Sequence, residues 1–511
     1  MTLQQLEGLF YLIGKFSCQR FLFHIKLQKL KQIFTHQRHH KSQSITNQTI
    51  RSQKMQKEKT ITENNLTKGN VLRILFTFSL PFIAANLIQA LYGAVDLFVI
   101  GRYCSPESVA AVSTGTQVTQ IITSMITGLT LGSTILVGKY TGMQAEEDIK
   151  KTIGTTLTIF AAAALILTAA MLLAADPILK LLKTPAPSFD LARTYVKICF
   201  CGIFFICGYN AISAILRGYG DSRRPMLFIA LSCALNIIGD FALVKGAGLG
   251  VAGVALATIG SQAVSMIAAI LYLNHRRFIF TFRLQNLRID WKKAKELATV
   301  GIPISLQECM VRLSFLYLTS ITNRLGIYAA SAVGVASKYD VFAMLPATSI
   351  ANALTAITAQ NYGAGKPERA RKSLLAGLTF ALAASSLFWL WAQLSPQTMI
   401  AVFSQDPAII KTGIPFFTAC SYDYLAVTLV FCINGYLNGR SQTIFTMISS
   451  CFGALILRIP LIYLVSTHTP DNLTRIGSIA PAVSFFMAAY TSLYLIHSYR
   501  HEKRAMSQST H

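Results

Sequence analysis

From residue 71 onward the chain alternates between long apolar stretches and short polar breaks. A helix of about 20 apolar residues is long enough to cross a hydrocarbon core about 30 Å thick. Twelve stretches meet that length, so the pattern predicts an all-α integral membrane protein with twelve transmembrane helices. Their approximate bounds are 74–100, 109–138, 152–174, 192–216, 226–245, 251–273, 297–323, 329–356, 373–395, 411–435, 444–466 and 476–497.

The first six stretches resemble the last six. KYTGMQAEEDIKK at 139–151 aligns with QNYGAGKPERARK at 360–372, and ILRGYGDSR at 215–223 aligns with CINGYLNGR at 432–440. A six-helix unit repeated once gives two parallel copies related by an axis along the membrane normal, and alternating-access carriers are built in this way. The repeat therefore predicts two pseudo-symmetric six-helix lobes.

The polar segments divide the chain into five parts. Residues 1–70 form a basic, polar leader, 71–273 the N-lobe, 274–296 a basic linker, 297–498 the C-lobe and 499–511 a tail. Two interpretations of residues 1–54 stay open. They are either a disordered extension or sequence upstream of a true start at Met55.

Composition supports a membrane protein. Hydrophobic residues make up 53% and charged residues 13%, whereas a soluble protein carries about 25% charged residues. The net charge of +25 is distributed unevenly. The even-numbered connections between helices carry 18 Lys and Arg and the odd-numbered ones eight, and short basic loops stay in the cytoplasm. Both termini are therefore expected on the cytoplasmic side of the cell's inner membrane.

Buried carboxylates are the most informative residues of the N-lobe. An ionised side chain in a spanning helix costs at least about 2.5–3.5 kcal/mol, so each one suggests a functional site. Asp96 lies in the first helix, and Asp240 lies one helical turn after Asn236 on the same face of the fifth. With hydroxyls from Tyr195 and Thr258, Asn236 and Asp240 would form an oxygen-rich pocket for a proton, Na⁺ or a cationic substrate. Alternatively, Asp96 reaches the outer interface and the other two polar residues bind helices together.

The C-lobe offers weaker candidates. Glu308 and Arg312 are four residues apart, a spacing that favours an ion pair within the helix. Asp423 is a lone carboxylate and Arg458 a lone cation, each within a predicted span. These two either face a water-filled cavity or neutralise each other.

Several other functions are not indicated. Gln360 and Pro367 occupy positions where a phosphate-binding loop needs Gly and Ser or Thr, which argues against direct use of ATP. The cysteines and histidines form no metal-ligand pattern, so no cofactor and no metal beyond a transported Na⁺ is expected. No nucleophile and base meet at one face, and no nucleic-acid-binding motif is present. The chain is expected to be neither an enzyme nor a nucleic-acid-binding protein.

Five segments carry a resemblance to a known family. They are SLPFIAANLIQALYGAVDLFVIGRY, GLTLGSTILVGKYTG, ILRGYGDSRRPM, NIIGD and GVALATIGSQ. Over residues 66–500 the chain resembles the multidrug and toxic compound extrusion (MATE) family, in its DinF-like and NorM-like branches. The resemblance implies two lobes that form an outward-opening V. It also implies a monomer that exports amphipathic, often cationic drugs in exchange for H⁺ or Na⁺.

The resemblance also implies roles for individual N-lobe residues. Asp96 matches the aspartate of the family's first helix, and Asn236 with Asp240 matches the N-x-x-x-D pair of its fifth. Tyr195 and Thr258 match the partners that these residues have in the DinF-like branch. Together the five residues would bind the coupling cation.

Other matches are partial. Pro81 matches the proline at which the first helix bends when its aspartate is protonated, and Asp423 matches an aspartate used by the NorM-like branch. Glu308 lies near that branch's glutamate but not at its position. The chain departs from the family at Gly239 and Phe241, where a bulkier residue and a proline are usual.

Two other functions compete with drug export as interpretations of the sequence. A flippase for lipid-linked oligosaccharides or peptidoglycan precursors, on a related fold, would need a strongly cationic cavity to bind a diphosphate. The intramembrane charges here are mostly carboxylates. A membrane receptor or channel would not need buried acidic pairs in a duplicated scaffold. The sequence therefore favours a secondary active multidrug efflux transporter.

Overall fold

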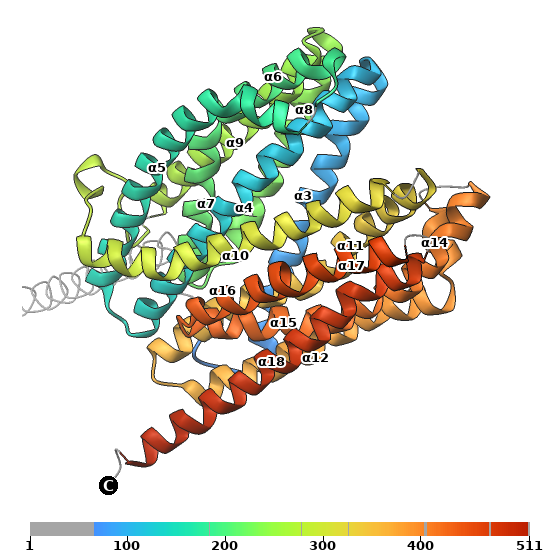
Figure 1. Cartoon of the computed structure of the whole chain (residues 1–511). Coiled ribbons are helices and arrows are strands. Elements are labelled where there is room, and N and C mark those ends of the chain that lie inside the picture. The colour runs from blue at the N-terminus through green and yellow to red at the C-terminus, as the bar shows by residue number, and fades with distance from the viewer. Residues whose placement is uncertain are drawn as a thin grey trace, which may run out of the picture. The chain divides into compact units, whose positions relative to one another are not determined.

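The computed structural model describes residues 66–508, except for 183, 277, 325–326, 403–405 and 470–471. The described residues form helices and connecting loops with no strand among them. Helix labels follow Figure 1, where the first described helix is α3. Residues 1–65, and with them most of the predicted leader and Met55, lie outside the described part.

The N-lobe begins at α3, which Asn70 caps by accepting hydrogen bonds from the backbone N–H groups of Leu72 and Arg73 at 2.9 and 3.3 Å. Its elements are α3 (Val71–Tyr103), α4 (Pro106–Gly142), α5 (Glu146–Leu181), α6 (Ala186–Cys201), α7 (Ile203–Gly218), α8 (Arg223–Asp240), η1 (Phe241–Gly246) and α9 (Gly250–His275).

A short helix, η2 (Leu284–Asn286), lies in the linker before the C-lobe. The C-lobe elements are α10 (Trp291–Arg324), α11 (Ile327–Gly363), α12 (Pro367–Leu394), α13 (Pro396–Ala401), α14 (Pro407–Cys420), α15 (Tyr422–Gly439), α16 (Thr443–Cys451), η3 (Phe452–Arg458), α17 (Ile459–His468) and α18 (Leu473–Gln508).

Ten helical spans in the described part of the chain are long and apolar enough to cross a membrane. An eleventh is the pair α6 and α7, which is bent by 46° at Gly202. A Cβ atom at Gly202 would lie 2.6 Å from Cγ1 of Ile259, so glycine permits the close approach of α9 at this bend. The twelfth predicted span is α10, a 34-residue helix that is not among the ten.

Both lobes contain a π-helix in the fifth helix of the repeat. In the N-lobe, η1 directly follows the end of α8 at Asp240, and in the C-lobe, η3 interrupts the same helix of the repeat and ends at Arg458. A π-helical turn inserts extra backbone into a helix and is frequent at functional sites. Both π-helices thus lie beside ionisable residues that the sequence marks as candidates.

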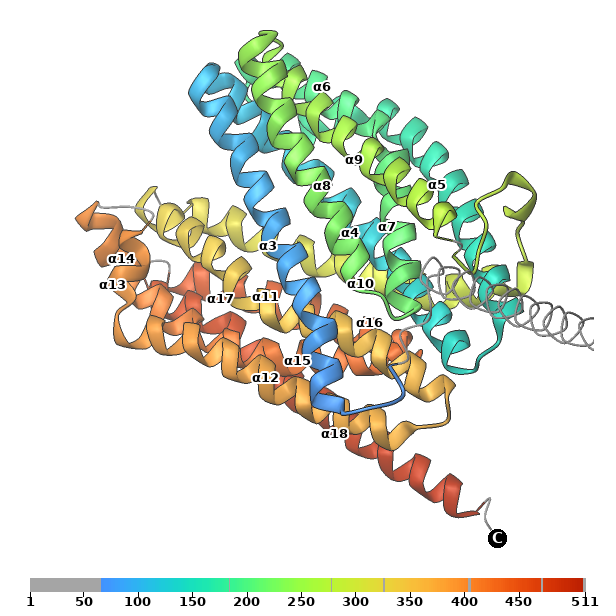
Figure 2. The same cartoon turned by 180° about the vertical axis from the view of Figure 1, so that it is seen from behind.

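The first helix packs against both lobes. Leu75, Phe78 and Phe82 near its start belong to a hydrophobic cluster with residues of α11, α12 and α15. Val99 and Ile100 near its end belong to the N-lobe cluster. Figure 2 shows α3 passing along α8 and then along the C-lobe helices, which it contacts. The start of α3 is therefore part of the C-lobe core, and its end is part of the N-lobe core.

The two lobes end their second helix in the same way. At the end of α4 the hydroxyl of Tyr140 donates a hydrogen bond to Glu296, which follows the sixth helix of the N-lobe. At the end of α11 the hydroxyl of Tyr362 donates to Glu502 at 3.3 Å, and Glu502 lies near the end of α18. In each lobe, therefore, a tyrosine near the end of the second helix is bonded to a glutamate, which lies on α10 in one case and on α18 in the other. We call the end of the helix bundle that carries these contacts and the basic connections the basic end.

Candidate functional site

The predicted carboxylates of the N-lobe lie together. Asp96 on α3 is 6% exposed, and Asn236 and Asp240 on α8 are fully buried. The side chains of Asn236 and Asp240 both lie close to the Asp96 carboxyl group. The carboxyl groups of two helices therefore meet inside the N-lobe.

Close packing of α8 on α9 adds a third helix to this cluster. A Cβ atom at Gly239 would lie 3.0 Å from Cβ of Ala257, a distance that few real contacts reach. The amide nitrogen of Asn236 lies 3.5 Å from the hydroxyl oxygen of Thr258 on α9. Gly239, one of the departures from the family pattern, thus lets Thr258 approach. Phe241, the other departure, begins η1 directly after Asp240.

Several acceptor atoms of this cluster lack hydrogen-bond donors. Oδ1 of Asp96, Oδ1 of Asn236 and both carboxylate oxygens of Asp240 are buried and have no hydrogen-bond partner among the described residues. Two adjacent carboxylates cannot both stay ionised in a buried site unless a cation joins them or one takes up a proton. Oxygen ligands suit hard cations. The cluster can therefore take up a proton or a small cation.

One predicted member, Tyr195, has a different partner. Its hydroxyl pairs with the hydroxyl of Thr116 on α4 at 3.3 Å rather than with either carboxylate. The tyrosine that does lie at the cluster is Tyr92, which is within hydrogen-bonding reach of Thr258 and close to both aspartates. Sequence analysis missed Tyr92, although its position one helical turn before Asp96 places both on one face of α3.

The C-lobe candidates form a second polar cluster. Asp423 on α15 and Arg458 at the end of η3 are 4% and 8% exposed. Arg458 is close enough to interact electrostatically with Asp423 and with Asp340 on α11. The guanidinium group also lies 3.5 Å from the hydroxyl of Ser314. Oδ1 of Asp423 and Nε of Arg458 are nevertheless buried without a hydrogen-bond partner among the described residues, so both interpretations of this pair stay predictions.

Glu308 and Arg312 do not form the ion pair that their spacing suggests. No ion pair between them is present in the described structure, where Arg312 is exposed and Glu308 partly buried. Spacing on a helix allows such a pair, but an exposed arginine gains little from it. Neither residue is among the contacts of the Asp423 and Arg458 cluster.

The predicted hinge residue is part of an unbroken helix. Pro81 is buried inside α3, which runs through it without interruption to Asp96 and beyond. Fifteen residues of helix separate the two, a distance of about 22 Å.

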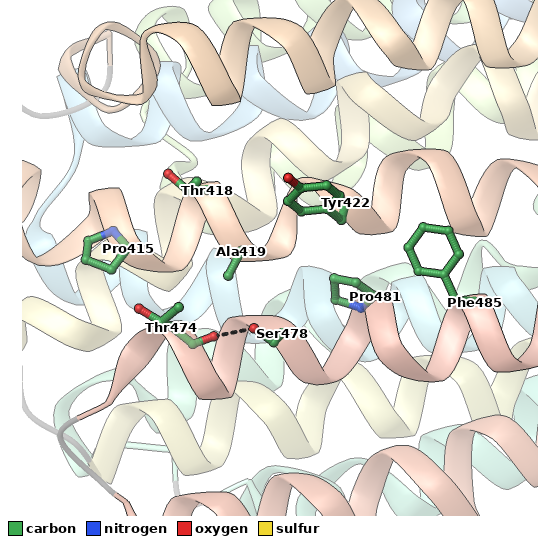
Figure 3. A pocket seen from close by; sticks show the side chains of 8 residues that line it. All are labelled: Pro415, Thr418, Ala419, Tyr422, Thr474, Ser478, Pro481 and Phe485. Atoms are coloured by element: carbon green, nitrogen blue, oxygen red, sulfur yellow. Dashed lines mark hydrogen bonds between the residues drawn. The ribbon is translucent and has the colours of Figure 1, made fainter.

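A cavity lies in the C-lobe, outside the carboxylate cluster of the N-lobe. It has a volume of about 540 Å³ and opens between α14, the start of α15 and α18 (Figure 3). It is lined by Pro415, Thr418, Ala419, Tyr422, Thr474, Ser478, Pro481 and Phe485. No charged side chain lines it, and the hydroxyl of Ser478 is already bonded to the carbonyl of Thr474 at 2.7 Å. Its lining provides no carboxylate, in contrast to the N-lobe cluster.

Comparison with known proteins agrees with the duplicated fold. A profile of the MatE family matches the chain twice, at residues 81–242 and 303–464, once in each lobe. The chain belongs to the MatE family. This confirms the resemblance and the all-α fold inferred from the sequence, and family membership makes the chain a multi-pass membrane transporter.

Relatives of this MatE protein cover most of its length. The probable multidrug resistance protein YpnP of Bacillus subtilis is 25% identical over 78% of this chain and 89% of its own. The probable multidrug resistance protein NorM of Thermotoga maritima is 26% identical over 84% and 92%. A solved structure described as an outward-facing multidrug resistance MATE transporter has a TM-score of 0.81 at 21% identity, covering 87% and 99%.

Proposed function

We propose that this MatE protein exports amphipathic, often cationic drugs by exchange with H⁺ or Na⁺, and that the exchanged cation binds at the N-lobe carboxylates. The observation that supports the site is the group of buried acceptor oxygens of Asp96, Asn236 and Asp240 that lack donors. Burying such a group in a membrane is energetically costly unless a cation or a proton binds to it. The names of the relatives support drugs as the substrates.

In the proposed mechanism the drug and the coupling ion bind in alternation. Binding of H⁺ or Na⁺ at Asp96 and Asp240 neutralises the cluster. The loss of charge bends α3 at Pro81 and expels the drug, and the loaded ion then drives the return. Exchange requires only that drug and ion favour different states or exclude each other.

Orientation and assembly are part of the proposal. The basic connections assign the basic end to the cytoplasm, so both termini would be cytoplasmic and Asp96, near the far end of α3, would lie toward the outside. We propose that the chain acts as a monomer in the inner membrane, because both lobes and both polar clusters are contained in one chain.

The first experiment neutralises the cluster. Asp96→Asn and Asp240→Asn each remove one charge with little change in volume. Each is expected to reduce export of ethidium or norfloxacin at least about tenfold in an efflux-deficient host, because the cation can no longer be bound between two carboxylates. Dye retention with a protonophore, in buffers with and without Na⁺, identifies the ion.

Asp190→Asn is the matched control, because this aspartate is 87% exposed and pairs only with Arg193 on its own helix. Export should be unchanged in this variant at equal amounts of membrane protein. If both Asp96→Asn and Asp240→Asn export drug normally, the proposed site is wrong.

A further inference from the structure

The two lobes touch at the basic end, where α4 and α11 finish. A Cβ atom at Gly142 would lie 2.0 Å from the carbonyl oxygen of Gln360, and one at Gly363 would lie 2.1 Å from the carbonyl oxygen of Lys139. Real Cβ atoms do not come so close, so only glycine allows this contact. Gly142 and Gly363 are equivalent positions of the internal repeat. The lobes therefore meet nearly symmetrically, backbone against backbone.

One side chain breaks that symmetry. Gln360 is fully buried at this contact. Its amide nitrogen donates to the carbonyl of Gly218, at the end of α7 in the N-lobe, at 2.8 Å. Its amide oxygen accepts from the backbone N–H of Leu66 at 3.2 Å. A single C-lobe residue thus holds both the N-lobe and the segment that precedes α3.

That segment is itself held by the C-lobe. The Leu66 side chain is 5% exposed and belongs to the cluster of α11, α12 and α15. The amide nitrogen of Asn361 donates to the Leu66 carbonyl at 3.4 Å, and the ammonium group of Lys366 donates to the Thr67 carbonyl at 3.1 Å. Residues 66–67 therefore cover the contact between the lobes and are fixed by three side chains of the C-lobe.

We propose that Gln360 is the latch of the basic end: its two hydrogen bonds keep the lobes closed there, and residues 66–67 complete the closure. The inference rests on the proposed export function, because alternating access requires that the lobes separate at this end in one state. Release of the bonds to Gly218 and Leu66 is then the step that opens the protein toward the cytoplasm. Losing both bonds would shift the population toward the open state.

The closed contact can be measured with a disulfide. A Cβ atom at Gly138 would lie 3.1 Å from Cβ of Ala359 across the lobes, and cysteines bridge at about 3.5–4.5 Å. In the full chain without its native cysteines, Gly138→Cys with Ala359→Cys should oxidise rapidly. Adding Gln360→Ala should slow cross-linking roughly tenfold or more, because the two cysteines would meet less often.

Two further variants distinguish loss of the latch from misfolding. Lys366→Met removes an exposed side chain and its bond to Thr67, and should slow cross-linking roughly two- to threefold. Gln393→Ala is the control, because Gln393 bonds only to Thr418 and Ser421 within the C-lobe. It should leave the cross-linking rate unchanged. Thermal melting of each variant shows whether slower cross-linking reflects a shift toward the open state or a loss of folded structure.

Unchanged cross-linking in both Gln360→Ala and Lys366→Met would overturn the latch. A slowing as large in Gln393→Ala as in Gln360→Ala would overturn it as well. The measurement needs no drug and no ion gradient, so it is independent of the export assay. Normal export by the Asp96→Asn and Asp240→Asn variants would contradict the ion site and leave the latch result standing.

Discussion

The buried carboxylates of the two lobes differ in what surrounds them. Asp96 and Asp240 in the N-lobe have neutral polar neighbours, and among the described residues no Lys or Arg pairs with them. Asp423 in the C-lobe has Arg458 as an electrostatic neighbour. Asp240 directly precedes η1 and Arg458 ends η3, so in each lobe an ionisable residue lies at one end of the π-helix of the fifth helix.

This difference indicates how one duplicated scaffold can hold two kinds of site. A carboxylate that has a permanent cation beside it is already compensated, and separating the pair leaves a buried charge. A carboxylate pair without a cation must obtain one from solution or take up a proton. The comparison therefore favours the N-lobe as the place of exchange and a structural role for the C-lobe pair.

The largest effect is expected from giving the N-lobe a cation of its own. Thr258→Lys places an ammonium group beside Asp96 and Asp240, where it should replace the coupling ion. Export should fall at least about tenfold, whereas Thr258→Met, similar in length but uncharged, should keep a larger share of it. Drug export per transporter measures both. Equal losses in the two variants would contradict the comparison.

Removing the C-lobe cation is expected to act on stability. Arg458→Met leaves Asp423 buried without its counter-charge and should cost about 3–5 kcal/mol of unfolding free energy. Adding Asp423→Asn to the same chain should recover part of that loss, because Asp340 is then the one carboxylate that has lost Arg458 as its neighbour. Thermal or denaturant unfolding of the purified variants measures their unfolding free energies. A double variant as unstable as the single one would show that the pair is not a unit.

A smaller effect is expected from separating α8 and α9. Gly239→Ala places a methyl group 3.0 Å from Cβ of Ala257, and overpacking of this kind costs about 1–3 kcal/mol. The apparent affinity for the coupling ion should fall several-fold, because Asn236 and Thr258 move apart. Gly260→Ala on α9 is the matched control, since its added methyl group meets nothing within 4 Å. Ion dependence of export distinguishes the two.

The smallest effect is expected from removing a single tyrosine hydroxyl. Tyr92→Phe removes the hydroxyl within reach of Thr258, a loss of about 0.5–1.5 kcal/mol, and should weaken ion dependence about two- to tenfold. Tyr195→Phe removes a hydroxyl that pairs with Thr116 and should leave ion dependence unchanged. The same export assay over a range of ion concentrations tests both. The reverse order of effects would favour the pocket first expected from the sequence.

Features that depend on local periodicity could be predicted. Apolar stretches of membrane length gave the spans, and the four-residue spacing of Asn236 and Asp240 placed both on one face of a helix. Asp96 joins them because the first and fifth helices are adjacent in this fold, which the family resemblance supplied. The structure brings these three residues and Thr258 together.

Features that depend on distant contacts could not be predicted. The partner of Tyr195 is 79 residues away and that of Gln360 is 142 residues away. No spacing rule connects such positions. Gln360 was notable in the sequence only as the residue that breaks a phosphate-loop pattern. The π-helices were also missed, because no residue pattern in the sequence signals an inserted turn.

The first helix has a consequence for how the protein is made. Leu75, Phe78 and Phe82 belong to a cluster with residues of α11, α12 and α15, which a ribosome synthesises several hundred residues later. Until then, the start of α3 has lipid or chaperone as its neighbour. The start of α3 therefore completes its packing only after the C-lobe has been made, and an isolated N-terminal half of the chain would lack the surface that holds it.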